Sequence, residues 1–173
     1  MNSGTAVIFM GSKVDYDHVS RIEEWLDKFG VTHETRIASA HKTPEKLLSI
    51  LKDLEAREGN FVYITVAGLS NALSGMADFA TTRPVVSCPP PSEAFGGADI
   101  YSSLRLPPGV AASLVLDPRN AALFAAKILA LGSPTIRAGI AAFQAEQRMK
   151  IEADDASLDS LGETRARFED ETL

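Results

Sequence analysis

The chain has 173 residues, of which 45% are hydrophobic and 23% charged, as in a single compact domain with a real core. Its net charge is -6, of which -5 falls on residues 146–173. This acidic balance argues against a nucleic-acid-binding surface, which needs clustered lysines and arginines, but it is compatible with a small phosphorylated ligand. The single cysteine, Cys88, excludes an internal disulfide and a Cys-rich zinc site, and no apolar run reaches the ~18 residues of a membrane span, so we expect a cytoplasmic protein.

Strand-like and helix-like patterns alternate along the chain. Continuous apolar or β-branched runs predict strands, and apolar residues at three- and four-residue steps predict helices. The first half is expected to contain a strand at 5–10, a helix capped by Asp15 or Asp17 and closed by Gly30, a strand at 31–38, a helix at 44–54 and a strand at 61–66. The second half is expected to contain a short helix at 71–80, a strand at 84–87, a helical turn at 98–104, a strand at 110–116, a helix at 120–131 and a helix from Pro134 to about Ala156.

This alternation predicts an α/β fold, a flavodoxin-like three-layer sandwich whose five-stranded parallel sheet has the order 2-1-3-4-5, with a C-terminal helix. Residues 1–156 are expected to form a single catalytic domain that includes this packing helix, and residues 157–173 a polar, flexible tail. Ligands of such sheets bind outside the carboxyl ends of the strands. Residues 11–15, 39–42 and 67–75 should therefore surround one crevice, with residues 87–97 as a further wall.

The expected crevice holds groups suited to a phosphate ester. Ser12, Ser39 and Lys42 supply hydroxyls and an ammonium, and helix N-termini supply backbone N–H groups. Each residue also has a structural explanation: Gly11-Ser12 as a tight turn, Asp15 as a helix cap, Ser39 as a residue that closes its own turn, and Lys42 as a surface charge. Their convergence on one edge of the sheet favours binding.

His41 is the candidate acid/base, because it lies in a predicted turn between a hydroxyl and an ammonium. His18, on a helix face that looks exposed, and His33, on a strand, are assigned structural or solvent roles. Cys88 is expected to be a small hydrophobe at a strand end rather than a nucleophile. No His, Asp and Glu cluster has metal-ligand spacing and no serine lies in a nucleophile elbow, so we expect neither a metal nor another cofactor.

Several ordered blocks resemble the aminoimidazole ribonucleotide (AIR) carboxylase family of purine biosynthesis, known as PurE. The blocks are Met10 to Ser12 with Asp15, Ser39 to Pro44, Ala67-Gly68 with Ser70-Asn71, Ser87 to Pro90, Gly97 to Arg105, Pro107 and Asn120 to Leu123. The resemblance covers about residues 6–131 and implies that His41 is catalytic. The substrate-binding residues that it implies are Gly11, Ser12, Asp15, Ser39, Lys42, Gly68, Ser70 and Asn71.

Within this family, the sequence looks like the class II branch, which carboxylates AIR with free CO2. Mutases, which use the carbamate of AIR, typically have an arginine after the histidine and a longer loop with a second histidine. Here Lys42 follows His41, and the loop from Leu69 to Gly75 is shorter and lacks histidine. Two positions depart from the family pattern: Val14 stands where a serine is usual, and Leu69 where this branch often has arginine.

The resemblance further implies a reversible, cofactor-free carboxylation and a homo-octamer in which loops of adjacent chains complete each site. Two other functions stay open. One is the carbamate mutase, and the other is a noncatalytic nucleotide- or flavin-binding module. A flavin calls for aromatic side chains around its ring, and only Tyr101 and Phe95 are available near the expected crevice.

Overall fold

The structure, a computed structural model, describes residues 4–170 and the side chains of residues 4–158. A five-stranded parallel sheet of order β2-β1-β3-β4-β5 forms its centre, which confirms the predicted flavodoxin-like topology. The strands are β1 (Thr5–Met10), β2 (Thr32–Ile37), β3 (Phe61–Val66), β4 (Val85–Ser87) and β5 (Ser113–Leu114). The strand β1 pairs with both β2 and β3, so the chain connections diverge on either side of it.

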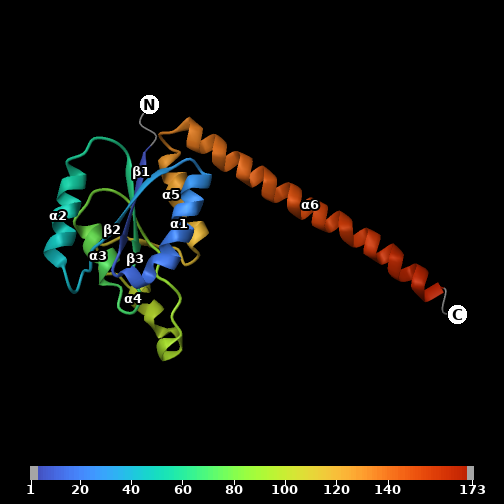
Figure 1. Cartoon of the computed structure of the whole chain (residues 1–173), viewed down its shortest axis with the longest axis horizontal. Helices are drawn as coiled ribbons and strands as arrows, with labels where there is room; N and C mark the ends of the chain where they lie inside the picture. Colours follow the sequence, from blue (N-terminus) through green and yellow to red (C-terminus); the bar gives the residue numbers. More distant parts are fainter. Residues whose placement is uncertain (1–3, 171–173) are drawn as a thin grey trace.

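Helices cover both faces of the sheet (Figure 1). On one face lie α1 (Tyr16–Lys28) and α5 (Pro118–Leu129), and on the other lie α2 (Pro44–Glu55) and α3 (Ala72–Phe79). In β1, Ile8 belongs to the first core layer, whereas Val7 and Phe9 belong to the second. Because successive side chains of a strand point to opposite faces and both faces are buried, β1 and β3 are mostly apolar, with Thr65 as a buried polar residue of β3.

The helix α5 starts two residues earlier than its apolar pattern indicates. Asp117 caps it, since the Asp117 carboxylate accepts hydrogen bonds from the backbone N–H groups of Arg119 (2.8 Å) and Asn120 (3.1 Å), and Pro118 takes the first helical position. Its buried face is made of alanines, which let the helix approach the sheet closely: Ala121, Ala122, Ala125 and Ala126.

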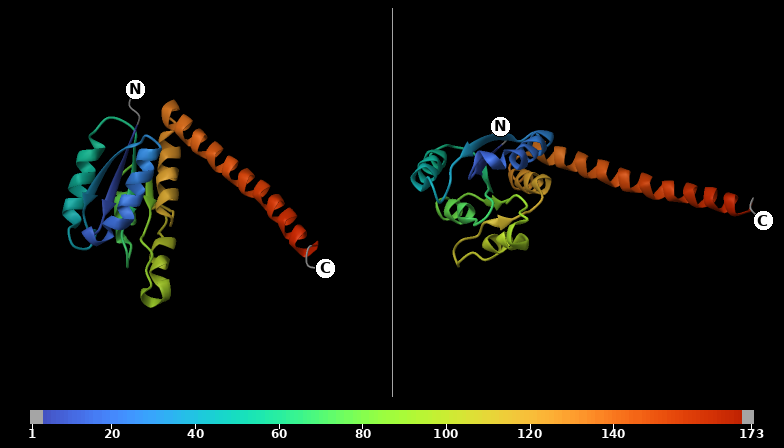
Figure 2. Two further views of the ribbon diagram at one scale, coloured as in Figure 1. Left: turned by 45° about the vertical axis from the view of Figure 1, so that its right-hand side comes forward. Right: turned by 60° about the horizontal axis from the view of Figure 1, so that its bottom comes forward.

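The strand expected at 110–116 is reduced to the two residues of β5, which pair with the end of the short strand β4. The backbone N–H of Ala111 instead donates to the carboxylate of Asp78, at 2.7 Å. Before β5, a 3₁₀ helix η2 (Ala94–Ile100) and the short helix α4 (Tyr101–Leu104) project beyond the carboxyl edge of the sheet (Figure 2). This projection is longer than the expected helical turn.

The strand β2 forms one edge of the sheet, and its residues are half-buried or exposed. Side-chain contacts hold it to its neighbours. Glu34 pairs with Arg57 at 3.2 Å, and His33 lies 3.1 Å from Asp27. His33 therefore has the structural role that the sequence predicts.

Among the described side chains, those that tie the last helix, α6 (Pro134–Asp170), to the domain lie in its first turns, as far as Glu146, which pairs with Lys28 at 3.8 Å. Ile136 and Ile140 are buried, and the ring of Phe143 contacts those of Trp25 and Phe29, with centroid distances of 5.3 and 5.5 Å. After these first turns the helix runs away from the sheet (Figures 1 and 2).

The helix was expected to end near Ala156, but it continues to Asp170. Its second half has no proline and is rich in Ala, Leu, Glu and Arg, all strong helix formers. A boundary at residue 156 between catalytic domain and tail stays a prediction. None of the helices in the described part of the chain is long and apolar enough to span a membrane.

Candidate functional site

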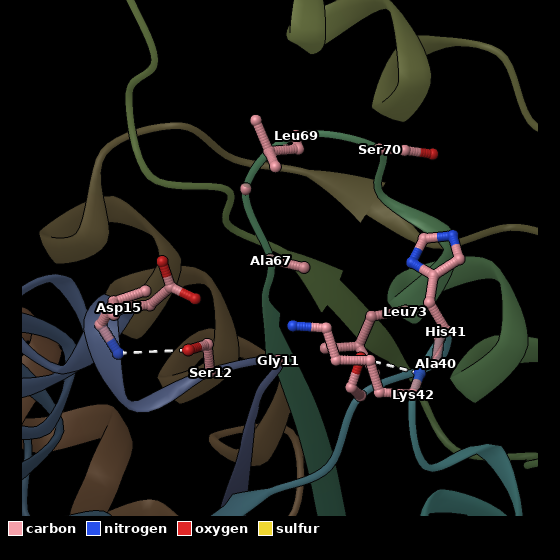
Figure 3. A pocket seen from close by; sticks show the side chains of 13 residues that line it. Gly11, Ser12, Asp15, Ala40, His41, Lys42, Ala67, Leu69, Ser70 and Leu73 are labelled. Atoms are coloured by element: carbon pink, nitrogen blue, oxygen red, sulfur yellow. Dashed lines mark hydrogen bonds between the residues drawn. The ribbon is translucent and has the colours of Figure 1, made fainter.

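A cavity of about 410 Å³ lies where β1, β2 and β3 end (Figure 3). The residues that line it are Gly11, Ser12, Val14, Asp15, Ser39, Ala40, His41, Lys42, Ala67, Gly68, Leu69, Ser70 and Leu73. The sheet thus brings three segments that are far apart in sequence to one edge, as the topology predicts. Every site residue expected from the sequence lies on this wall except Asn71.

The loop after β1 presents a hydroxyl to the cavity. The N–H of Gly11 donates to the carbonyl of Val66 at 3.0 Å, which ties the loop to β3. Ser12 caps the 3₁₀ helix η1 (Lys13–Asp15), because its Oγ accepts from the N–H of Val14 at 3.4 Å. This bond uses a lone pair of the oxygen, so the O–H proton of Ser12 is available for an anionic ligand.

Asp15 occupies the N-cap position of α1, but its side chain makes no capping hydrogen bond. The carboxylate instead lines the cavity. Partial burial raises the pKa of Asp15 above its ordinary value, since burial disfavours the charged form. The explanation of Asp15 as a side-chain cap is therefore wrong, and the carboxylate is left to accept hydrogen bonds from a ligand.

The loop after β2 is a closed turn. The N–H of Lys42 donates to Ser39 Oγ at 3.2 Å, and the N–H of Ser39 donates to Thr43 Oγ1 at 3.0 Å. Ser39 thus closes its own turn, which agrees with the structural explanation given for it above. Its O–H remains available to donate a hydrogen bond. These bonds fix the backbone on both sides of His41, which stands exposed at the tip of the turn.

The charged and titratable side chains enter the cavity from different sides. Lys42 and Asp15 extend into it from opposite sides, and the imidazole of His41 lies on the side of Lys42 away from Asp15, below Ser70 (Figure 3). The arrangement can hold an anionic ester among hydroxyls and an ammonium, and can present an acid/base to another part of the same ligand.

The loop after β3 forms the remaining wall. Leu69 has a φ of +57°, in the left-handed region that a leucine rarely adopts, and its side chain is 65% exposed. Asn71 is buried behind this loop and caps α3, because its Oδ1 accepts from the N–H of Ser74 at 3.2 Å. Leu73, in the first turn of α3, also lines the cavity; it lies within the expected segment 67–75 but was not singled out as a site residue.

A second cavity, of about 300 Å³, adjoins the first and shares Gly68 and Leu69 with it. Residues 87–97 were expected to wall the first crevice. Pro89 to Ser92 and Gly97 line this second cavity instead, because the proline run passes behind Gly68.

Of the other two histidines, His33 lies on the edge strand and His18 is buried. The expectation that His18 lies on an exposed helix face is wrong, because its ring packs against Cys88 under the end of β4. Cys88 is itself fully buried, as expected of a small hydrophobe. Among the described residues, no group of three or more His, Cys, Asp and Glu side chains is placed to hold a metal ion.

Comparisons with known proteins match almost the whole of this domain. A model of the family described as "AIR carboxylase" matches residues 5–150. The chain is 51% identical over 153 residues to a phosphoribosylaminoimidazole carboxylase of Archaeoglobus fulgidus, covering 88% of this chain and 84% of the relative. It is 46% identical over 152 residues to one of Treponema denticola, covering 88% and 96%. The crystal structure of Treponema denticola PurE superposes with a TM-score of 0.88 at 45% identity, covering 90% and 98% of the two chains.

Proposed function

The chain belongs to the AIR carboxylase family, and we propose that it catalyses the reversible carboxylation of 5-aminoimidazole ribonucleotide by CO2 to 4-carboxy-5-aminoimidazole ribonucleotide, in de novo purine biosynthesis. The observation that carries the proposal is the cavity at the ends of β1, β2 and β3, where His41 stands beside Lys42 and the free hydroxyls. We place this activity in the cytoplasm.

The phosphate of the nucleotide would bind to Lys42 and to the O–H groups of Ser12 and Ser39. Both serine oxygens already accept a backbone N–H, which leaves their O–H protons available to donate to the phosphate. Asp15, with no capping bond to make, would accept hydrogen bonds from the ribose hydroxyls. Gly11 and Gly68 would let the ligand approach the backbone closely.

The reaction needs an aligned pair of reactants rather than an activating group. AIR is an enamine, and the electron pair of its ring double bond forms the new bond from C4 to the carbon of CO2. The electron pair of one C=O π bond of CO2 moves onto the oxygen, and the CO2 carbon becomes that of a carboxylate. The C4–H bond then breaks, its electron pair restores the aromatic ring, and His41 accepts the proton. In the reverse direction His41 returns the proton, and CO2 leaves.

Free CO2 is the proposed carboxyl donor. Lys42 in place of arginine and the short loop without a second histidine support it, as do the names of the two relatives described above. The cavity lining contains no Phe, Tyr or Trp, which disfavours a flavin-binding module.

We also propose that the chain forms a homo-octamer. Four apolar residues of α6 after Gly132 favour contacts with a partner: Ile136, Ile140, Phe143 and Met149. The first three pack largely on this chain's own α1 and α5, whereas Met149 is exposed. The support comes from side chains left exposed farther on, Ile151 and Leu158, which lie seven residues apart on one face of α6. Phe95 is also 87% exposed on the projection next to the site. Light scattering at micromolar concentration tests this state, and a monomer would reject it.

The activity is tested by mixing the protein with AIR and bicarbonate and following the product by absorbance. Product formation should rise with dissolved CO2, need no ATP and survive a chelator. The carbamate of AIR, freshly made and supplied without CO2, is the second arm. Product from the carbamate alone, with no response to CO2, would replace the carboxylase with the mutase.

A further inference from the structure

Asn71 lies one residue behind the cavity wall and joins three parts of the domain. Its side chain is buried, and its amide nitrogen donates to Ser87 Oγ at 2.7 Å and to Ser103 Oγ at 2.8 Å. Its amide oxygen accepts from the N–H of Ser74 at 3.2 Å. One side chain thus links the loop after β3 to the end of β4, to α4 and to the first turn of α3.

The orientation of this amide is fixed by its partners. The N–H of Ser74 can only donate, so the oxygen of the amide must face it. Both N–H bonds of the amide then point to the two serine oxygens. A buried primary amide is costly without partners, and here both of its donors are used.

A second set of bonds holds the wall itself. The N–H of Asn71 donates to Ser102 Oγ at 3.0 Å, and the same hydroxyl lies 2.7 Å from the carbonyl oxygen of Asp99 and 3.2 Å from that of Leu69. The one O–H proton of Ser102 is shared between these two carbonyls. Leu69, whose carbonyl is at one end of this contact, itself has the left-handed conformation. Such a conformation persists for a non-glycine residue only when its surroundings impose it. The bonds to α4 and β4 provide that constraint.

We propose that Asn71 is a positioning residue, which holds the wall of Gly68, Leu69 and Ser70 in place where the reacting ring and CO2 meet. This inference rests on the proposed carboxylation. The groups proposed for the phosphate stand on the loops after β1 and β2, which are closed by their own hydrogen bonds. Asn71 makes no bond to either loop, so loosening it disturbs one end of the cavity and spares the other.

The test is the variant Asn71→Ser. Serine is also a good N-cap and can accept from the N–H of residue 74, but it cannot reach both Ser87 and Ser103. The KM for CO2 should rise at least ~10-fold and kcat fall, while the KM for AIR stays within ~3-fold of the wild type. Carbonic anhydrase in the assay keeps CO2 and bicarbonate at equilibrium.

The matched control is Ser133→Ala. Ser133 is also buried, and its Oγ accepts from the N–H of Ile136 at the start of α6, beside Asn60 at the opposite edge of the sheet. This control should lower the melting temperature without changing either KM. If Asn71→Ser does not fold, Ser103→Ala, which removes one of the two acceptors, should shift the KM for CO2 in the same direction by about 3-fold.

Hydrogen exchange separates this inference from the proposed function. Amides of residues 68–73 should exchange at least ~10-fold faster in Asn71→Ser than in the wild type, and Ser133→Ala should leave them unchanged. This measurement needs no substrate. A wild type that fails to carboxylate AIR would reject the carboxylase, whereas unchanged exchange, or an unchanged KM for CO2 in an active variant, would overturn the role of Asn71.

Discussion

The Nε2 atom of His18 lies 3.3 Å from the Sγ atom of Cys88, in a buried pair between α1 and the segment after β4. Burial lowers the pKa of His18 and raises the pKa of Cys88 to about 12. Both groups are therefore neutral at pH 7, and the pair is a hydrogen bond between uncharged partners. A thiol in this state is neither a nucleophile nor a metal ligand.

The Cys88 thiol should be unreactive in the folded protein. Fewer than ~5% of the molecules should react with a disulfide reagent within an hour at pH 8, because the thiolate is scarce and the sulfur is covered. In guanidinium chloride one thiol per chain should react at once, which serves as the control. Rapid labelling of the native protein would show that β4 opens readily or that the thiol is exposed.

The variant His41→Asn should keep the fold and the nucleotide affinity but lose at least ~100-fold in rate, because asparagine is polar and does not titrate. Circular dichroism and nucleotide binding check the fold and the site. The control is His33→Asn, which changes a histidine on the edge strand that is paired with Asp27. Near-normal turnover of His41→Asn would remove His41 from the mechanism.

The variant Lys42→Met should raise the dissociation constant for AIR at least ~10-fold, because a charge-assisted bond to the phosphate is lost. The effect should shrink as salt is added, since screening already weakens the wild-type contact. Lys46→Met, on an exposed turn of α2, is the matched control and should leave affinity unchanged. Equal affinity of wild type and Lys42→Met would place the phosphate elsewhere.

Asp117 should make the stability of the domain depend on pH in acid. Its bonds to Arg119 hold the pKa of this carboxyl at about 2, below its ordinary 3.8. A depressed pKa stabilises the fold above pH 3.8, and this contribution is lost as the pH falls towards 2. Asp117→Asn keeps a capping side chain but not the charge, so it should cost about 1 kcal/mol at pH 7 and progressively less below pH 4.

Urea unfolding of wild type and Asp117→Asn between pH 7 and 3 measures this difference. Asp53→Asn, at an exposed position of α2, provides the comparison. If the difference in the free energy of unfolding between wild type and Asp117→Asn stayed constant from pH 7 to 3, the charge of Asp117 would contribute nothing to stability.

The sequence predicted those parts of the fold that local patterns determine. β1 and β3 are buried on both faces, so their apolar runs begin and end where the strands do. The place of the cavity followed from the strand order, because the ends of parallel strands meet at one edge. The roles of the residues in it remain proposals.

What the sequence could not predict depends on partners far along the chain. His18 is buried against Cys88, 70 residues away, and the N–H of Ala111, in the segment expected to be a strand, donates to Asp78 instead of to a neighbouring strand. The same holds for Asn71, whose helix-capping role has a local signal but whose bonds to Ser87 and Ser103 have none. Sequence periodicity predicts on which face of a helix or strand a residue lies, but it does not predict which distant polar group the side chain contacts on that face.

The charged edge strand β2 has a consequence for the behaviour of the protein at high concentration. The outer side of an edge strand has unpaired backbone N–H and C=O groups, which can form hydrogen bonds with a strand of another molecule. Continued pairing of this kind leads to aggregation. A molecule that added its own strand here would have to accommodate the ion pair of Glu34 with Arg57 and the hydrogen bond between His33 and Asp27, which stand on either side of the strand. Strand addition at this edge is therefore opposed by charge, which protects the sheet from growing into fibres.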